Sequence, residues 1–208
     1  MLNRADALKR LASLAEGVPC IVSVGGVFLE WDKVRPSDGN FPLKTLGSGS
    51  SVGLGLALSL PHRTILVLDG DGAVLMNVNG LITVGRMQPK NLIHVVFDNK
   101  IYESSGRVPT ATAYNCSLTG IARGAGIRSV HDVDTTDDFL EVLRRTFTEP
   151  GPHFIVAATA ASDEDTSTNY PRLEEPDKKY SFIRWLEALE GRKLRENAID
   201  VKLSLRPT

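Results

Sequence analysis

The chain has 208 residues, which is enough for one domain of ordinary size with a substantial core. Its 24 basic and 25 acidic side chains leave a net charge of −1, so it lacks the basic surplus that nucleic-acid binding requires. No apolar run is long enough to span a bilayer, and Cys20 and Cys116 are too isolated to suggest a disulfide framework or a metal site. A cytoplasmic protein without a membrane partner is therefore expected.

Apolar strands alternate with helical segments along the first 160 residues. In chain order, the sequence predicts a helix over 3–16, a buried strand over 20–26, a small-residue helix over 47–60, a strand over 63–70, a helix over 77–87, a strand over 91–99, a helix over 118–125, a strand over 127–130, a helix over 136–147 and a strand over 153–159. Continuous apolar strands separated by helices favour a parallel sheet with helices on both faces. We therefore expect one doubly wound α/β domain over residues 1–160.

The composition changes after Thr159. Residues 161–208 are expected to hold a polar, proline-containing linker, an amphipathic helix and a tail over 198–208. The apolar face of this helix contains four side chains: Phe182, Ile183, Leu186 and Leu189. With Trp185 near that face, the helix should pack either on the domain or on a partner. The tail alternates apolar and polar residues, so it either adds an edge strand or frays.

Three of the predicted strands end in glycine and polar residues. Gly25 lies at the end of the first, the stretch Gly70-Asp71-Gly72 at the end of the second, and Asp98-Asn99 at the end of the third. Because ligands of open parallel sheets bind beyond the carboxyl ends of the strands, these residues are candidates for one site. A glycine at position 72 lets the backbone approach an anion closely, and the N–H groups of the helix that opens at Ala73 would point at it.

The polar side chains at these strand ends suit a metal ion. Asp71 offers a carboxylate oxygen and Asn99 an amide oxygen, which are the hard ligands that Mg²⁺ or Ca²⁺ takes. Taken alone, the Gly-Asp-Gly stretch could be only a tight turn. However, a helix and a buried strand are predicted between Gly72 and Asp98, as two neighbouring strand ends that share one ion would require. The residues therefore predict a diphosphate bridged to a metal ion at a helix N-terminus.

This spacing resembles the cofactor signature of thiamine diphosphate enzymes, in which Gly-Asp-Gly is followed by an Asn-Asn-like pair. More narrowly, residues 18–190 are similar to the diphosphate-binding half of phosphonopyruvate and sulfopyruvate decarboxylases, as in "IARGAGIRSV" and "GPHFIVA". The resemblance implies thiamine diphosphate and Mg²⁺ as cofactors, with the metal bound by Asp71, Asn99 and the Ile101 carbonyl. The candidate cofactor-binding residues are Gly25, Lys44, Leu46, Gly70, Asp71, Gly72, Ala73, Asn99, Ile101 and Tyr102.

The same resemblance assigns a role to the start of the small-residue helix. Counting back from Gly55 aligns the family's Gly-Ser-Met-Gly with Lys44-Thr45-Leu46-Gly47. In this family the residue before the glycine wedges beneath the cofactor, so Leu46 is the candidate wedge. The Lys44 carbonyl would accept a hydrogen bond from the aminopyrimidine. The alternative is that Leu46 is only a core residue.

Two segments differ from the family pattern and concern the substrate. The family's Thr-Ser-Arg-Glu is replaced by residues 27–30, and its Gly-Gly-Gln-Pro-Thr by residues 106–110. Both are expected to be loops of the kind that hold a phosphonate or sulfonate. Their replacement predicts a less polar pocket and leaves the choice between these acids and another 2-oxo acid open. Arg107 is either a relocated anion-binding side chain or a solvated loop charge, and Tyr102 contacts either the substrate or a partner.

The size of the chain has a consequence for assembly. The family's activating glutamate belongs to a separate pyrimidine-binding domain, and this chain has room for only one domain. We therefore expect the diphosphate-binding subunit of a thiamine diphosphate-dependent carboxy-lyase, a 2-oxo-acid decarboxylase active only as a heteromer with a pyrimidine-binding, α-type subunit. No catalytic residue is assigned to this chain. The alternatives are a subunit of a carboligase that resembles acetolactate synthase, and a non-catalytic cofactor-binding module.

Other reactive side chains do not form a recognisable site. None of the four histidines, His62, His94, His131 and His153, lies at a readable spacing from a carboxylate, so core or surface imidazoles are expected. Ser104 and Ser105 lack the strand–turn–helix context of a nucleophile elbow.

Overall fold

A parallel sheet forms the centre of the structure. The computed structural model describes residues 1–162 and 175–194, and in these ranges the sheet has six strands in the order β2-β1-β3-β4-β6-β5, each parallel to its neighbours. The strands are β1 (Cys20–Ser23), β2 (Asn40–Leu43), β3 (Ile65–Gly70), β4 (Leu92–Asp98), β5 (Ser129–Val133) and β6 (His153–Ala158). Because β2 and β3 lie on opposite sides of β1, the strand order reverses between β1 and β3.

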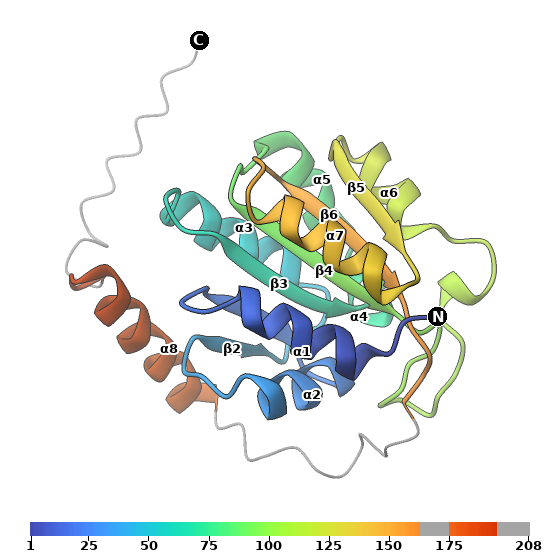
Figure 1. Ribbon diagram of the computed structural model, residues 1–208, viewed down its shortest axis with the longest axis horizontal. Helices are drawn as coiled ribbons and strands as arrows, with labels where there is room; N and C mark the ends of the chain where they lie inside the picture. The colour runs from blue at the N-terminus through green and yellow to red at the C-terminus, as the bar shows by residue number, and fades with distance from the viewer. Residues whose placement is uncertain (163–174, 195–208) are drawn as a thin grey trace.

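Helices cover both faces of the sheet (Figure 1). Those on one face are α1 (Arg4–Leu14), α2 (Gly26–Val34) and α7 (Thr136–Thr146); those on the other are α3 (Gly49–Ser59), α4 (Asp71–Leu75), α5 (Asn79–Met87) and α6 (Leu118–Gly124). A short 3-10 helix, Ala111–Ala113, lies in the connection between β4 and α6.

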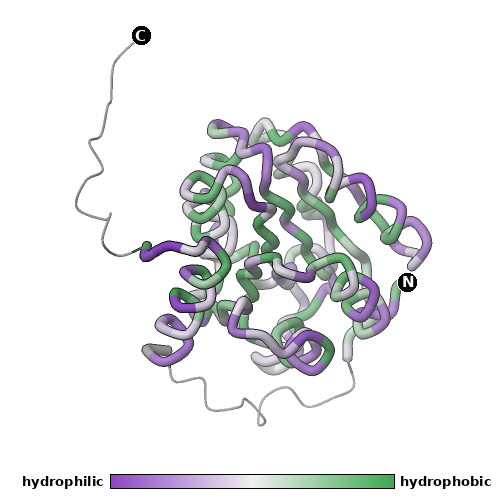
Figure 2. Tube along the Cα trace, turned by 60° about the vertical axis from the view of Figure 1, so that its left-hand side comes forward, coloured by the Kyte–Doolittle hydropathy of each residue, from purple (hydrophilic) through white to green (hydrophobic). Residues whose placement is uncertain are grey.

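The sheet separates two hydrophobic cores. Alternate side chains of β3 enter them, with Leu66 and Leu68 on the α1 side and Ile65 and Val67 on the α3 side. In Figure 2 the hydrophobic residues gather along the central strands. The expected doubly wound α/β fold is confirmed.

α2 and β2 are not predicted from the sequence. α2 starts directly after Gly25, whose φ of 126° lies in the region that favours glycine. The expectation of a loop over residues 27–30 is wrong, because they lie in α2 and bury Val27 and Phe28 on the sheet. β2 is a short strand at the edge of the sheet, where its Pro42 is tolerated.

The C-terminal amphipathic helix is α8 (Glu175–Glu190). Phe182 and Leu186 are buried in the core on the α3 side of the sheet. The Trp185 ring packs on Gly39, where an added Cβ would lie 2.7 Å from the ring. The helix was expected to pack either on the domain or on a partner, and the structure shows contacts with the domain. The tail over 198–208 lies outside the described residues. No helix in the described ranges is long and apolar enough to cross a membrane.

Candidate functional site

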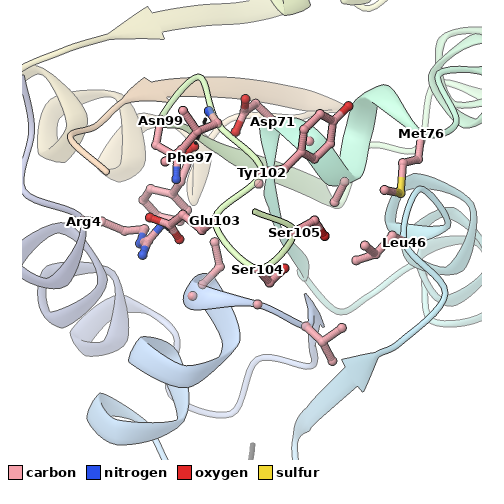
Figure 3. Close-up of a pocket in the computed structure, with 18 residues that line it drawn as sticks. Arg4, Leu46, Asp71, Met76, Phe97, Asn99, Tyr102, Glu103, Ser104 and Ser105 are labelled. Atoms are coloured by element: carbon pink, nitrogen blue, oxygen red, sulfur yellow. Dashed lines mark hydrogen bonds and ion pairs between the residues drawn. The ribbon is translucent and has the colours of Figure 1, made fainter. Parts of the chain in front are cut away.

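A cleft opens at the carboxyl ends of β1, β3 and β4, where the strand order reverses (Figure 3). Its walls are the residues that follow these strands, the start of α2, and Leu46. Every candidate cofactor-binding residue lines the cleft except Lys44, whose carbonyl accepts a 3.0 Å hydrogen bond from the N–H of Leu46. The fold therefore brings four segments that are distant in sequence to one place.

Asp71, the first residue of α4, is buried on the β3 side of the cleft. Its Oδ2 accepts hydrogen bonds from Thr110 Oγ1 (2.6 Å) and Thr112 Oγ1 (3.2 Å). Thr112 Oγ1 also lies 2.8 Å from Asp98 Oδ1, so two carboxylates share this corner. Burial raises the pKa of Asp71 to about 6, the threonine hydrogen bonds oppose the rise, and the charge of Asp98 adds to it. Two carboxylates in one buried corner favour a divalent cation.

The loop after β4 contains the other two oxygen ligands that the resemblance implies. Because β3 and β4 pair up to Gly70 and Phe97, Asp71, which follows β3, and Asp98, the last residue of β4, lie at neighbouring strand ends. Asn99 Oδ1 accepts a 3.0 Å hydrogen bond from the N–H of Ile101, which fixes the turn that carries the Ile101 carbonyl. In the described ranges no three His, Cys, Asp or Glu side chains are arranged so that they could hold a metal ion, so a metal here would depend on amide and carbonyl oxygens as well.

The ring of Tyr102 lies directly against Gly72. A Cβ added to Gly72 would lie 2.6 Å from Tyr102 Cδ1, so only glycine fits without movement of the ring. Figure 3 shows this ring beside Asp71, at the start of α4. Gly72 was expected to let an anion approach the backbone closely. In the structure it also makes room for the ring of Tyr102.

Leu46 borders the cleft from the segment before α3 (Figure 3). It is half-buried and belongs to neither hydrophobic core, which disfavours a purely structural role. The next residue, Gly47, has a φ of 83°, and a Cβ there would lie 2.7 Å from Asn77 Cβ. The segment that carries Leu46 is therefore fixed against the connection between α4 and α5.

A polar cluster that the sequence analysis does not predict lies between the sheet and the start of α3. The Oδ1 of Asp69 accepts a hydrogen bond from Ser23 Oγ, and its Oδ2 lies 2.8 Å from His94 Nε2. Ser50 Oγ lies 3.5 Å from His94 Nδ1. All four side chains are buried and none lines the cleft. The cluster therefore connects β1, β3, β4 and α3 beneath the site.

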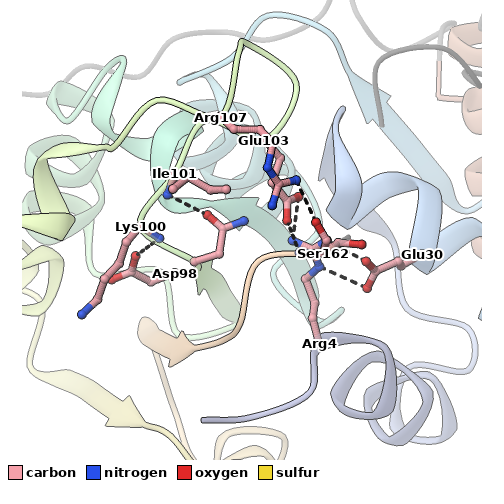
Figure 4. Close-up of polar contacts among 9 residues, drawn as sticks. Arg4, Glu30, Asp98, Lys100, Ile101, Glu103, Arg107 and Ser162 are labelled. Carbon is pink, nitrogen blue, oxygen red and sulfur yellow. Dashed lines mark hydrogen bonds and ion pairs between the residues drawn. The ribbon is translucent and has the colours of Figure 1, made fainter. Parts of the chain in front are cut away.

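A buried ion cluster borders the cleft on the side of α1. Arg4 pairs with Glu30 of α2 at 2.6 Å and with Glu103 of the loop after β4 at 3.0 Å (Figure 4). Burial alone would lower the pKa of Arg4, but hydrogen bonds and charges from the two glutamates outweigh this effect and raise it. This cluster could not be predicted from the sequence, because its members come from three distant segments.

Other candidate side chains lie outside the cleft. Arg107 donates a 2.8 Å hydrogen bond to the carbonyl of Ser162. His62 Nε2 lies 2.9 Å from a carboxylate oxygen of Glu190, and His94 belongs to the buried cluster described above, so two histidines do have carboxylate neighbours that are distant in sequence. The other two histidines contact the hydroxyl of a serine in β5.

Comparison with known proteins agrees with this geometry. Residues 33–157 match the family model described as the C-terminal TPP-binding domain of thiamine pyrophosphate enzymes, where thiamine pyrophosphate is another name for thiamine diphosphate. The chain is 33% identical over 190 residues to sulfopyruvate decarboxylase subunit beta of Methanocaldococcus jannaschii, which covers 90% of this chain and 97% of that one. It is 35% identical over 155 residues to phosphonopyruvate decarboxylase of Streptomyces viridochromogenes, but spans only 38% of that protein.

A solved structure shows the same fold. The X-ray structure of a candidate thiamin diphosphate-dependent enzyme from Mycobacterium smegmatis superposes with a TM-score of 0.66 at 18% identity, over 77% of this chain and 32% of that one. These matches confirm the resemblance drawn from the motifs around Asp71 and Asn99. The chain therefore belongs to the thiamine pyrophosphate enzyme family, as a C-terminal, thiamine pyrophosphate-binding domain.

Proposed function

We propose that this chain is the diphosphate-binding subunit of a 2-oxo-acid decarboxylase that uses thiamine diphosphate and Mg²⁺ and contains a second kind of subunit. The observation that carries the proposal is the set of oxygens from Asp71, Asn99 and Ile101 at the ends of β3 and β4, in the cleft that Leu46 also lines. Support also comes from the relative that matches nearly end to end, because it is named as the beta subunit of a sulfopyruvate decarboxylase.

The residues at the cleft fit a metal-bound diphosphate. The Asp71 carboxylate is buried beside that of Asp98, and its raised pKa shows that the ionised form is disfavoured there, a cost that a divalent cation would offset. Asn99 and the Ile101 carbonyl add neutral oxygens of the type that Mg²⁺ takes in proteins. In this proposal these residues hold the metal and the diphosphate, and Leu46 supports the cofactor in a bent shape.

The chain's own residues bind and orient the reactants. When bound, thiamine diphosphate supplies a nucleophilic carbon and an electron sink for the loss of CO₂ from a 2-oxo acid. The carboxylate of Glu103, which also borders the cleft, is paired with the guanidinium of Arg4, so it is not available as a general base. This pairing supports an activating glutamate on another polypeptide, as the resemblance implies.

We infer that the partner is a pyrimidine-binding, α-type subunit. Met76 lines the cleft and is 54% exposed, and a large apolar side chain at a site favours a covering protein surface. The partner would complete the site at the interface of a heteromer. A cytoplasmic setting would keep the two unpaired thiols reduced.

We propose sulfopyruvate as the substrate. The expectation of a less polar pocket depends partly on residues 27–30. These residues lie in α2, where Val27 lines the cleft but Leu29, which replaces the family's arginine, does not, and Phe28 is in the core. The relative of nearly equal length is named for sulfopyruvate. A panel of sulfopyruvate, phosphonopyruvate and pyruvate, scored by relative kcat/KM, tests the choice. A higher kcat/KM for pyruvate than for sulfopyruvate would contradict it.

Reconstitution tests the proposed function as a whole. The purified chain, supplied with thiamine diphosphate and Mg²⁺, should release no CO₂ from any acid of the panel. Addition of a purified pyrimidine-binding subunit from the same organism should restore decarboxylation, and a complex that contains the Asp71→Ala variant should remain inactive. Turnover by the chain alone would overturn the two-subunit proposal. Formation of a condensed 2-hydroxy-2-alkyl acid by the complex would favour the carboligase alternative.

A further inference from the structure

The buried ion cluster joins two helices to the loop that borders the cleft. Arg4 donates two hydrogen bonds to Glu30, from Nη2 to Oε1 at 2.6 Å and from Nε to Oε2 at 3.1 Å. It donates a third from Nη1 to Glu103 Oε2 at 3.0 Å. The side chains of Arg4 and Glu103 are only 4% and 7% exposed. Because desolvation offsets much of the attraction within a buried ion pair, such a cluster is better suited to fixing a position than to adding stability.

Glu103 is held by three separate parts of the chain. Its Oε2 receives the Arg4 guanidinium, and its Oε1 accepts a 2.8 Å hydrogen bond from the N–H of Ser162, which follows β6 (Figure 4). The start of α2 lies against the same group, since a Cβ added to Gly26 would be 2.5 Å from both Arg4 Nη2 and Glu103 Oε2. The position of this carboxylate is therefore set by α1, by α2 and by the segment after β6.

The loop that carries Glu103 is a tight turn. The N–H groups of Ser105 and Arg107 both donate to the Tyr102 carbonyl, at 3.1 and 3.0 Å. Ser104 and Ser105 follow Glu103 directly, line the cleft and are exposed (Figure 3). Neither hydroxyl is hydrogen-bonded to any group in the part of the chain that the structure describes. The loop therefore presents two uncommitted hydroxyls to the cleft from an anchored backbone.

We propose that Glu103 is a positioning residue, which holds the loop so that the hydroxyls of Ser104 and Ser105 donate hydrogen bonds to the carboxylate of the 2-oxo acid. This inference rests on the proposed function. Two adjacent hydroxyls suit the two oxygens of a carboxylate. They are neutral, so they orient the carboxylate without the strong charge pairing that would stabilise it against the loss of CO₂.

Amide hydrogen exchange of the chain alone tests the positioning role without any activity. Glu103→Gln preserves the size of the side chain and leaves Arg4 paired with Glu30, so the fold should persist. Exchange of the amides over residues 102–107 should become about tenfold faster or more, with β3 and β4 unchanged. The control is Lys9→Gln, which removes a cation of α1 from an exposed pair with Asp6 and should leave loop exchange unchanged. Unchanged loop exchange in Glu103→Gln would overturn the proposal.

Steady-state kinetics of the reconstituted complex with sulfopyruvate test the contact with the substrate. Glu103→Gln and the double variant Ser104→Ala/Ser105→Ala should each raise KM about tenfold or more, with kcat and the Kd of thiamine diphosphate within about threefold of wild type. The double variant should leave loop exchange as in wild type. A rise in cofactor Kd parallel to KM would contradict the proposal. If the wild-type complex decarboxylates none of the acids, the proposed function and the substrate contact both fail, whereas the exchange result still decides whether Glu103 positions the loop.

Discussion

Asp69 and Asp71 are almost equally buried, at 1% and 2% exposed, but their surroundings differ. The carboxylate of Asp69 accepts the Ser23 hydroxyl and contacts a ring nitrogen of His94, so its acceptors are satisfied within the chain. Asp71 receives two threonine hydroxyls but shares its corner with the carboxylate of Asp98. Asp69 therefore has a structural role within the fold, whereas Asp71 and Asp98 form a negatively charged corner that suits a cation.

The largest expected effect is on stability, from replacement of Asp69. Asp69→Ala leaves Ser23 and His94 without their shared partner, and each buried unsatisfied group costs ~1–3 kcal/mol. The free energy of unfolding should therefore fall by about 2–5 kcal/mol. At neutral pH and without metal, Asp71→Ala should leave it unchanged or raise it, because the substitution removes a buried carboxylate whose ionised form is disfavoured, and the freed threonine hydroxyls still bond each other. Urea unfolding of the two variants measures both changes, and equal losses would remove the distinction between the two aspartates.

The pH dependence of stability should report the titration of Asp71 when metal is absent. Because the pKa of Asp71 is raised to about 6, the folded chain binds this proton more tightly than the unfolded chain. Stability should therefore fall as the pH rises from about 4 to about 6, by on the order of 3 kcal/mol. Asp71→Asn should flatten this part of the profile. Urea titrations across this range in a chelating buffer measure it, and an unaltered profile in the variant would assign the proton to another group.

Substitution of Leu46 distinguishes support of the cofactor's bent shape from binding of its diphosphate. Leu46→Ala should reduce kcat of the reconstituted complex about tenfold while the Kd of thiamine diphosphate changes by less than about threefold, since the metal and diphosphate ligands remain. The melting temperature should hardly change, because Leu46 lies outside both cores. A lower melting temperature with intact turnover would make Leu46 an ordinary structural residue.

Substitutions at two glycines should change stability with opposite signs. Gly72→Ala should destabilise the chain by about 1–3 kcal/mol, since its Cβ would meet the Tyr102 ring. Gly55 lies in α3 with no atom within 4 Å of an added Cβ. Gly55→Ala should therefore stabilise the chain by about 0.5–1 kcal/mol through backbone entropy. Thermal unfolding compares the pair, and stabilisation by both substitutions would show that Tyr102 does not require the glycine.

The site residues at the strand ends could be predicted from the sequence, because the pattern that identifies them lies within a short stretch of the chain. Asp71 and Asn99 each follow an apolar strand directly, and the segment between them fits one helix and one strand. The surrounding clusters could not be predicted, because His94 lies 25 residues from Asp69, and Glu103 lies 99 residues from its Arg4 partner. Such pairs exist only once the sheet has formed.

The element α2 could have been found. Its buried residues Val27, Phe28 and Trp31 have helical spacing, but the preceding glycines and the family comparison favoured a loop. β2 gives a weaker signal, since a short edge strand that contains Pro42 has no periodic pattern. The order of most helices and strands could therefore be predicted from the sequence, but the start of α2, which forms the wall of the site next to β1, was not.

Calorimetric titration of the reconstituted complex with thiamine diphosphate in Mg²⁺ buffer tests the central claim, that Asp71 and not Asp69 holds the metal and diphosphate. Asp71→Ala should raise the Kd about tenfold to a hundredfold, since a lost charge-assisted contact costs ~1.5–3 kcal/mol. The control is Asp69→Asn, which keeps the size of the side chain in the buried cluster and should leave the Kd within about threefold of wild type. An unchanged Kd in Asp71→Ala would contradict the account.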